Sequence, residues 1–318
     1  MTPNNPAHPE VSKENVRKLL AGDKRSLTRV LSWVENRYPE GREALRDLYA
    51  HTGRAQIIGI TGPSGSGKST LVGALAREYR RRGRTLGIVA IDPTSPFSHG
   101  AILGDRIRMQ DLTADPGVFI RSLATRGALG GLAWATNDVV SVMDAFGKDV
   151  IIVETVGAGQ DEVEIAGTAH TTIVVNIPGA GDDMQAIKAG ILEIADILVV
   201  NKADLPTAEI VFKQLHIYTD LQRKPGWDVP ILKTVVHKEE GIAEVLDAVE
   251  KHWAFLQESG RIEEVTRQRS RRQLLATAES ILLERVTTGA DAKIDQLAEQ
   301  IAARELDPRT AAERLIEG

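Results

Sequence analysis

The sequence predicts an α/β fold built on a doubly wound, mostly parallel sheet. Short runs of almost wholly apolar residues occur at 55–61, 85–91, 149–154, 171–177, 196–201 and 229–236. Such runs are typical of strands that are covered on both faces, and helix-like patterns alternate with them. This alternation favours parallel strands joined by helices, and ligands then bind at the carboxyl ends of the strands. We place this main domain at residues 54–256.

The segment before the main domain, residues 11–53, is predicted to be helical. Apolar residues recur there at three- and four-residue spacing, as in Leu27, Val30 and Val34. The segment carries no catalytic pattern, so we expect it to pack against the main domain. Residues 1–10 are polar and proline-rich, which predicts a disordered lead.

The first apolar run ends in a glycine-rich turn with the complete spacing of a P-loop, Gly62-x-x-x-x-Gly67-Lys68-Ser69. Glycines let successive backbone N–H groups surround phosphate oxygens, and the following helix adds the positive end of its dipole. In this pattern Lys68 reaches the β- and γ-phosphates, and the Ser69 hydroxyl holds Mg²⁺. The main domain is therefore predicted to be a P-loop NTPase. The expected phosphate-binding residues are Gly62, Pro63, Ser64, Gly65, Ser66, Gly67, Lys68, Ser69 and Thr70.

Three acidic residues that follow predicted strands are candidates for the Mg²⁺ shell. Asp92 closes the second strand, and Asp105 lies in the polar segment 94–108, which suits a loop that orders around the metal. Glu154 ends the third strand, and the N–H of Gly157 can meet the γ-phosphate. The alternatives are a turn-forming Asp92, a helix cap at Asp105 and an ordinary strand-end acid at Glu154.

Two features bear on hydrolysis. A loop from Pro178 to Lys188 contains Asp182 and Gln185 and is expected near the phosphates, although Asp182 can alternatively cap a helix. No glutamine directly follows Gly157, so the usual water-positioning residue of Ras-like switches is missing. We therefore expect slow intrinsic hydrolysis, with a partner completing the site.

The fifth predicted strand ends in the guanine signature Asn201-Lys202-x-Asp204. Asp204 can accept hydrogen bonds from the guanine N1–H and exocyclic amine, for which adenine has no matching pair of donors. Asn201 can meet the purine or hold the P-loop, and the Lys202 stem can cover the base face. Val235 and Val236 end the sixth predicted strand, at the place where a small-residue pair commonly closes the pocket, and backbone N–H groups there can still contact the base.

Composition and charge limit the function classes. The chain has 318 residues with ordinary globular composition, a net charge of −5 and no cysteine. Nothing in this charge balance favours nucleic acid, and no apolar run approaches the ~20 residues of a membrane span. Disulfides and thiolate metal sites are excluded, and the histidines lack ligand spacing. We expect a cytoplasmic protein.

Residues 257–318 form a different segment, predicted to be a helical arm. It begins with a basic, helix-like run whose arginines are best explained as a solvated face. An apolar stripe runs along it, made of Leu274, Leu275, Ile281 and Leu282. An exposed stripe on a terminal helical arm predicts dimerisation.

Several stretches together resemble the MeaB/ArgK/MMAA family of G-proteins. They are Thr94–Ser98, Gly100–Met109, Glu154–Gly157 with Gly159-Gln160, and Asn201–Asp204. The likeness covers nearly the whole chain. It implies a homodimeric GTPase that binds GTP or GDP with Mg²⁺ and acts as a chaperone of an adenosylcobalamin-dependent acyl-CoA mutase. In this family, GTP binding and hydrolysis gate delivery of adenosylcobalamin and help to remove inactivated cofactor.

The resemblance also implies roles for individual residues. The metal and phosphate positions correspond to Lys68, Ser69, Asp92, Asp105 and Glu154. A third switch corresponds to the loop that ends at Lys188, so the expected catalytic set is Lys68, Glu154, Asp182, Gln185 and Lys188. Val235 and Val236 replace the family's Ser-Ala pair. Methylmalonyl-CoA, isobutyryl-CoA and 2-hydroxyisobutyryl-CoA mutases remain open as clients.

Other functions compete with the GTPase chaperone. A nickel-insertion GTPase should carry a histidine- or cysteine-rich tract, and the sequence has none. A P-loop kinase of a small molecule needs a base for its acceptor hydroxyl and commonly prefers ATP, which the Asn-Lys-x-Asp motif disfavours. An interaction module with a dead nucleotide site is disfavoured by the intact Lys68, Ser69 and Glu154.

Overall fold

The computed structural model describes residues 9–92, 109–124, 131–155, 164–178, 189–221, 224 and 226–317. It divides into two compact units, Met1–Ser270 and Arg271–Gly318. The predicted limits of the lead, the N-terminal segment, the main domain and the arm stay predictions.

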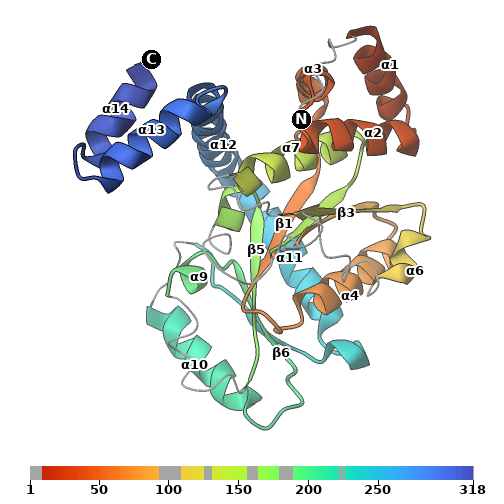
Figure 1. The fold of residues 1–318 in the computed structure, drawn as a ribbon. Helices are drawn as coiled ribbons and strands as arrows, with labels where there is room; N and C mark the ends of the chain where they lie inside the picture. Colours follow the sequence, from red (N-terminus) through yellow and green to blue (C-terminus); the bar gives the residue numbers. More distant parts are fainter. Residues whose placement is uncertain are drawn as a thin grey trace. The chain divides into compact units, whose positions relative to one another are not determined.

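The first unit is organised around a seven-stranded parallel sheet (Figure 1). Its strands are β1 (Gln56–Thr61), β2 (Leu86–Asp92), β3 (Val118–Ala124), β4 (Val150–Glu154), β5 (Thr171–Asn176), β6 (Ile197–Asn201) and β7 (Ile231–Thr234). They lie in the order β3-β2-β4-β1-β5-β6-β7, and every neighbouring pair is parallel. The prediction of a doubly wound α/β fold is confirmed, with β1 at the centre of the sheet.

Strand β3 was not among the apolar runs that the sequence analysis identified. Arg121 and Ser122 interrupt the apolar run, as expected of a strand at the edge of the sheet. The guanidinium of Arg121 is held by an ion pair with Glu35, to which its Nε donates at 3.0 Å. The partner comes from an N-terminal helix, so the sequence near β3 gives no sign that this arginine is paired.

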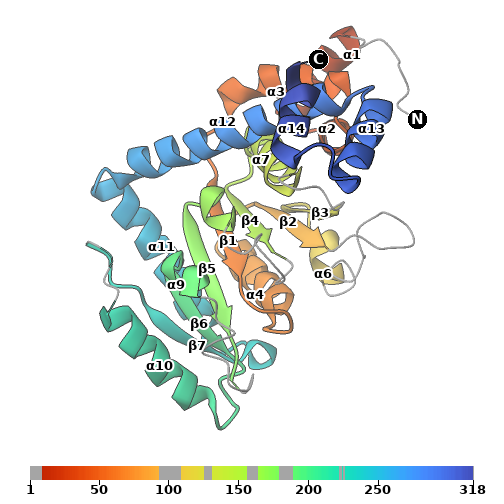
Figure 2. The same cartoon turned by 60° about the vertical axis from the view of Figure 1, so that its left-hand side comes forward.

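Helices cover both faces of the sheet. The described helical elements between Tyr49 and Glu258 are η1 (Tyr49–His51), α4 (Lys68–Arg81), α6 (Gln110–Thr113), α7 (Gly131–Ala145), η2 (Ile165–Gly167), α9 (Ala189–Glu193), α10 (Ala208–Leu221), η3 (Val236–Lys238) and α11 (Ile242–Glu258). Helices α4 and α11 pack together on one face (Figure 2), over Ile58 and Ile60 of β1. Helix α7 covers the other face, over Ile57 and Val153. Burial on both faces explains why the strands are almost wholly apolar.

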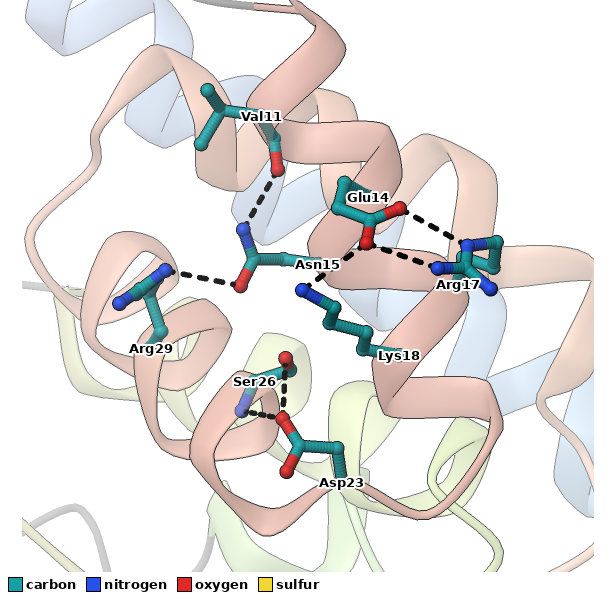
Figure 3. A network of polar contacts seen from close by, with 8 residues as sticks. All are labelled: Val11, Glu14, Asn15, Arg17, Lys18, Asp23, Ser26 and Arg29. Carbon is teal, nitrogen blue, oxygen red and sulfur yellow. Dashed lines mark hydrogen bonds and ion pairs between the residues drawn. The ribbon is translucent and has the colours of Figure 1, made fainter.

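The N-terminal helices α1 (Pro9–Leu20), α2 (Lys24–Glu35) and α3 (Pro39–Leu48) complete the second face. Leu27, Val30 and Val34 are buried in the same apolar cluster as α7, so the predicted packing against the main domain is confirmed. Polar contacts support these helices (Figure 3): Asn15 accepts a hydrogen bond from Arg29 at 3.4 Å, and Asp23 caps α2 through the Ser26 N–H at 2.9 Å.

A buried carboxylate joins α7 to the beginning of the central strand. Asp144 accepts hydrogen bonds from the N–H groups of Gly53, Arg54 and Ala55, at 2.5, 3.1 and 2.9 Å. These residues lead directly into β1, so Asp144 fixes the start of the strand whose other end carries the glycine-rich turn.

The arm begins with α12 (Arg261–Thr287), which spans the division between the two units. The second unit continues with α13 (Asp291–Ala302) and α14 (Pro308–Glu317), which pack against each other. Its exposed large apolar side chains are Leu274, Leu275, Ile281, Leu282, Leu283 and Ile316. Within the described residues, no helix has the length and apolar character that a membrane span requires.

Candidate nucleotide-binding site

The glycine-rich turn joins β1 to α4 and depends on its glycines. Gly62, Gly65 and Gly67 have φ of 141°, 76° and 88°, a region that residues with a side chain rarely adopt. A Cβ on Gly62 would lie 2.2 Å from the backbone oxygen of Val175, and one on Gly67 would lie 2.4 Å from Nδ2 of Asn201. The turn therefore packs directly on β5 and on the end of β6.

Lys68 is the first residue of α4, and its side chain is buried. Its ammonium donates hydrogen bonds to the carbonyl oxygens of Gly62 at 2.8 Å and Pro63 at 3.0 Å. The positive charge thus lies within the turn, at the N-terminus of a helix whose dipole also favours anions. This arrangement is suited to phosphate.

Ser69 lies next to the acid predicted for the metal shell. Its hydroxyl donates to Oε1 of Glu154 at 2.6 Å, and Glu154 is buried at the end of β4. Beyond Glu154, the Thr155 N–H donates to the Ile60 carbonyl at 3.1 Å, which keeps the end of β4 against β1. A hydroxyl and a carboxylate are the oxygen ligands that Mg²⁺ prefers, so the two residues fit such an ion.

The guanine motif is attached to the glycine-rich turn. Asn201 donates from Nδ2 to the Ser66 carbonyl at 2.9 Å and accepts at Oδ1 from the Thr234 hydroxyl at 3.1 Å. Lys202 has φ of 55° and donates from Nζ to the Gly65 carbonyl at 3.2 Å. Of the two contacts that the sequence left open for Asn201, the one with the P-loop is present in the structure.

Asp204 lies at the outer end of the motif, with 35% of its side chain exposed. Oδ2 of Asp204 is 3.9 Å from Nε2 of His237, which the sequence analysis did not select. Val235 and Val236 are buried, and the Val235 N–H donates to the Glu240 carbonyl at 3.1 Å. One of the backbone donors expected for the base is therefore already engaged. The sequence signal for His237 was its place directly after the valine pair.

Among the remaining predicted residues, some have a described side-chain exposure and others do not. Pro63 is half-buried, whereas Ser64 and Thr70 are exposed on the turn and on the first turn of α4. Asp92 ends β2 beside β4, and nothing is described of its side chain. Five predicted residues lie outside the described part of the chain: Asp105, Gly157, Asp182, Gln185 and Lys188.

The sequence comparison identifies the family. The family model for the methylmalonyl Co-A mutase-associated GTPase MeaB matches residues 27–291. The chain belongs to the MeaB family. The predicted relationship to MeaB and ArgK G-proteins is therefore confirmed, as is the prediction of a P-loop GTPase fold.

Similar proteins match most of the chain. A Pyrococcus abyssi protein, whose name marks it provisionally as a GTPase, is 46% identical over 95% of each chain. GTPase ArgK of Escherichia coli is 33% identical over 96% of this chain and 95% of its own. The methylmalonic aciduria type A homolog of Caenorhabditis elegans is 32% identical over 78% of this chain and 67% of its own.

A solved structure shows the same arrangement of elements. The crystal structure of an LAO/AO transport system kinase matches with a TM-score of 0.74 and 26% identity, covering 98% of this chain and 99% of that one. Membership of the MeaB family, together with a P-loop bonded to the guanine motif, gives the basis for a functional proposal.

Proposed function

We propose that this chain is a GTPase that binds GTP and GDP at the turn between β1 and α4. The supporting observation is the pair of bonds from Asn201 and Lys202 to the carbonyls of Ser66 and Gly65. These bonds bring the guanine motif and the P-loop together, although they are 135 and 137 residues apart. On binding, Lys68 exchanges loop carbonyls for phosphate oxygens, and Asp204 accepts from the base.

Magnesium is the expected cofactor of the phosphates. Ser69 and Glu154 would hold it, since the Ser69 hydroxyl and Oε1 of Glu154 are 2.6 Å apart. Asp92 and Asp105 are the further acids proposed for its shell. The ion neutralises charge on the phosphates when bound. Glu154 is longer than the aspartate that most GTPases use at this position, so it can act on the metal through a water molecule.

Hydrolysis is proposed to be slow in the isolated protein. The residues proposed for γ-phosphate sensing and catalysis are Gly157, Asp182, Gln185 and Lys188, together with Lys68 and Glu154. No glutamine directly follows Gly157, so a partner is expected to complete the positioning of the attacking water. Loops ordered by the γ-phosphate and released on hydrolysis would make the protein a switch.

The proposed partner is an adenosylcobalamin-dependent acyl-CoA mutase. The matched family is described by its association with methylmalonyl-CoA mutase, and one relative is named for methylmalonic aciduria. We propose that nucleotide state gates cofactor loading and removal of inactivated cofactor. Methylmalonyl-CoA, isobutyryl-CoA and 2-hydroxyisobutyryl-CoA mutases are the candidate clients. We propose a cytoplasmic homodimer that acts without nucleic acid or membrane.

A small-molecule kinase is the second candidate, because the similar solved structure is titled a transport system kinase. A kinase commonly uses ATP, whereas a site with Asp204 at its base end is built to accept guanine donors. A site whose hydrogen bonds match one base can reject another by about 10⁴-fold or more. Base preference therefore distinguishes the two candidates.

To test the proposal, the rate of nucleotide hydrolysis is measured with Mg²⁺, for the protein alone and with each candidate mutase. GTP and ATP are compared, and release of phosphate is followed under conditions of excess nucleotide. We expect slow turnover that is selective for GTP and increases with one mutase. A mutase that does not change the rate but whose cofactor loading depends on GTP would still be the client.

Two results would contradict the proposal. Faster turnover of ATP than of GTP would overturn the guanine assignment and favour the kinase. GTP turnover and cofactor loading that are unaffected by every mutase would remove the chaperone role and leave a GTPase with a different client.

A further inference from the structure

The base end of the proposed site offers a side-chain donor that the guanine motif does not include. The first two residues after β7 are buried: Val235 and Val236 have little exposed surface, and Val236 belongs to the apolar core beneath α4 and α11. The Val235 N–H is bonded to the Glu240 carbonyl. The next residue, His237, has 66% of its side chain exposed.

The position of His237 relative to the motif is fixed by bonds between the two segments. The Ala203 N–H donates to the Thr234 carbonyl at 3.1 Å, and the Thr234 hydroxyl donates to Oδ1 of Asn201 at 3.1 Å. These bonds hold the β7–η3 connection beside the end of β6. Nε2 of His237 is consequently 3.9 Å from Oδ2 of Asp204, the carboxylate that the guanine motif assigns to the base.

Guanine chemistry gives this pair a role. When a carboxylate accepts hydrogen bonds from N1–H and the exocyclic amine, O6 lies at the adjacent ring position and needs a donor. An imidazole N–H within about 4 Å of the carboxylate can reach that oxygen. Adenine carries an amine there instead of an oxygen.

We propose that His237 donates a hydrogen bond to O6 of the bound guanine and is a specificity-determining residue. The proposal rests on the proposed GTPase function. Asp204 reads the donor edge of guanine, and His237 reads the neighbouring acceptor. The imidazole thereby takes over a contact that the engaged Val235 N–H does not supply.

The test measures dissociation constants of GDP and 6-thio-GDP for the whole chain and its variants. Sulfur in place of O6 keeps N1–H and the amine but is a weak acceptor. We expect His237→Ala to weaken GDP by about tenfold and 6-thio-GDP by less than about twofold, in line with the loss of one hydrogen bond. His237→Gln keeps a side-chain N–H and should restore most of the preference for GDP.

Controls separate this contact from general damage. Lys238→Ala removes the exposed side chain next to His237 on the same turn and should leave both constants unchanged. Asp204→Asn should favour xanthosine nucleotides whether or not His237 is present. Equal weakening of both nucleotides by His237→Ala, or no weakening of either, would overturn the role of His237. Failure of the wild-type protein to bind GDP would instead overturn the proposed function itself.

Discussion

Lys68 and Ser69 are adjacent at the start of α4 but contact different partners. The Lys68 ammonium is bonded to carbonyls of the turn, and the Ser69 hydroxyl is bonded to Glu154 on β4. Successive helical residues point about 100° apart, so one helix start supplies a cation toward the proposed phosphate site and a hydroxyl toward the proposed metal site. The sequence Gly-Lys-Ser at this turn therefore encodes two contacts with different chemistry.

Replacing Lys68 should weaken nucleotide binding without unfolding the protein. We expect Lys68→Ala to weaken GTP binding by roughly 10- to 100-fold, because charge-assisted hydrogen bonds contribute about 1.5–3 kcal/mol. The circular dichroism spectrum should stay native. Lys213→Ala, which removes an exposed lysine of α10, is the matched control and should bind GTP normally. Wild-type affinity in Lys68→Ala, measured by isothermal titration, would remove the turn from the binding site.

A single acid on α7 should make stability depend on pH. Burial raises the pKa of Asp138 from 3.8 to about 6, against the opposing effect of nearby Arg37. The folded state therefore binds the proton more tightly than the unfolded state, and this contribution is lost as pH rises from about 4 to 6. We expect Asp138→Asn to stabilise the protein at pH 7.5 by roughly 1–3 kcal/mol, since one pKa unit corresponds to about 1.4 kcal/mol.

Thermal unfolding at two pH values checks this prediction. The difference in Tm between Asp138→Asn and wild type should be largest at pH 7.5 and should nearly disappear at pH 4. A variant that is less stable than wild type at pH 7.5 would mean that the carboxylate makes a favourable contact when ionised.

At the scale of elements, the ends of β6 and β7 are joined to the P-loop by a residue of the guanine motif. Asn201 is the last residue of β6, and its amide links the Ser66 carbonyl to the Thr234 hydroxyl at the end of β7. One buried side chain thus ties two strand ends to the turn after a third strand. The proposed base site and the proposed phosphate site are therefore joined by direct hydrogen bonds.

Loss of this connection should affect both affinity and exchange. Asn201→Ala removes the donor to Ser66 and leaves buried polar groups without their partner, at a cost of about 1–3 kcal/mol. We expect GDP to dissociate at least about tenfold faster in stopped-flow experiments with a fluorescent GDP analogue. Thr234→Ser keeps the hydroxyl that donates to Asn201 and is the matched control. An unchanged dissociation rate in a folded Asn201→Ala variant would show that the link is dispensable.

Sequence patterns predicted those elements whose burial or backbone geometry depends on their own residue types. Strands β1 and β4 are apolar throughout because helices cover both faces, and the glycines of the turn follow from the close approach of Val175 and Asn201. Strand β3 was missed because the polar side chain of Arg121 finds its partner in α2, 86 residues away. His237 was missed for the same reason, since only the fold places it beside Asp204.

At the scale of the whole molecule, the two units differ in how they use apolar residues. The first unit buries large apolar clusters around the sheet, whereas the described residues of the second unit include only two buried apolar residues, Leu297 and Ala311. Leu275 and Leu282 are seven residues apart on α12, so they lie on one side of that helix. Exposed apolar side chains in such a row favour association with another chain.

The proposed homodimer can be tested on that row. We expect the protein to have the mass of two chains in light scattering coupled to size-exclusion chromatography. The double variant Leu275→Asp and Leu282→Asp should be monomeric and folded, because both side chains are exposed in the single chain and the new carboxylates would be desolvated in an interface. Leu221→Asp introduces the same charge at an exposed leucine of α10 and should remain dimeric. A dimeric double variant would place the interface elsewhere, and a monomeric wild type would exclude the dimer.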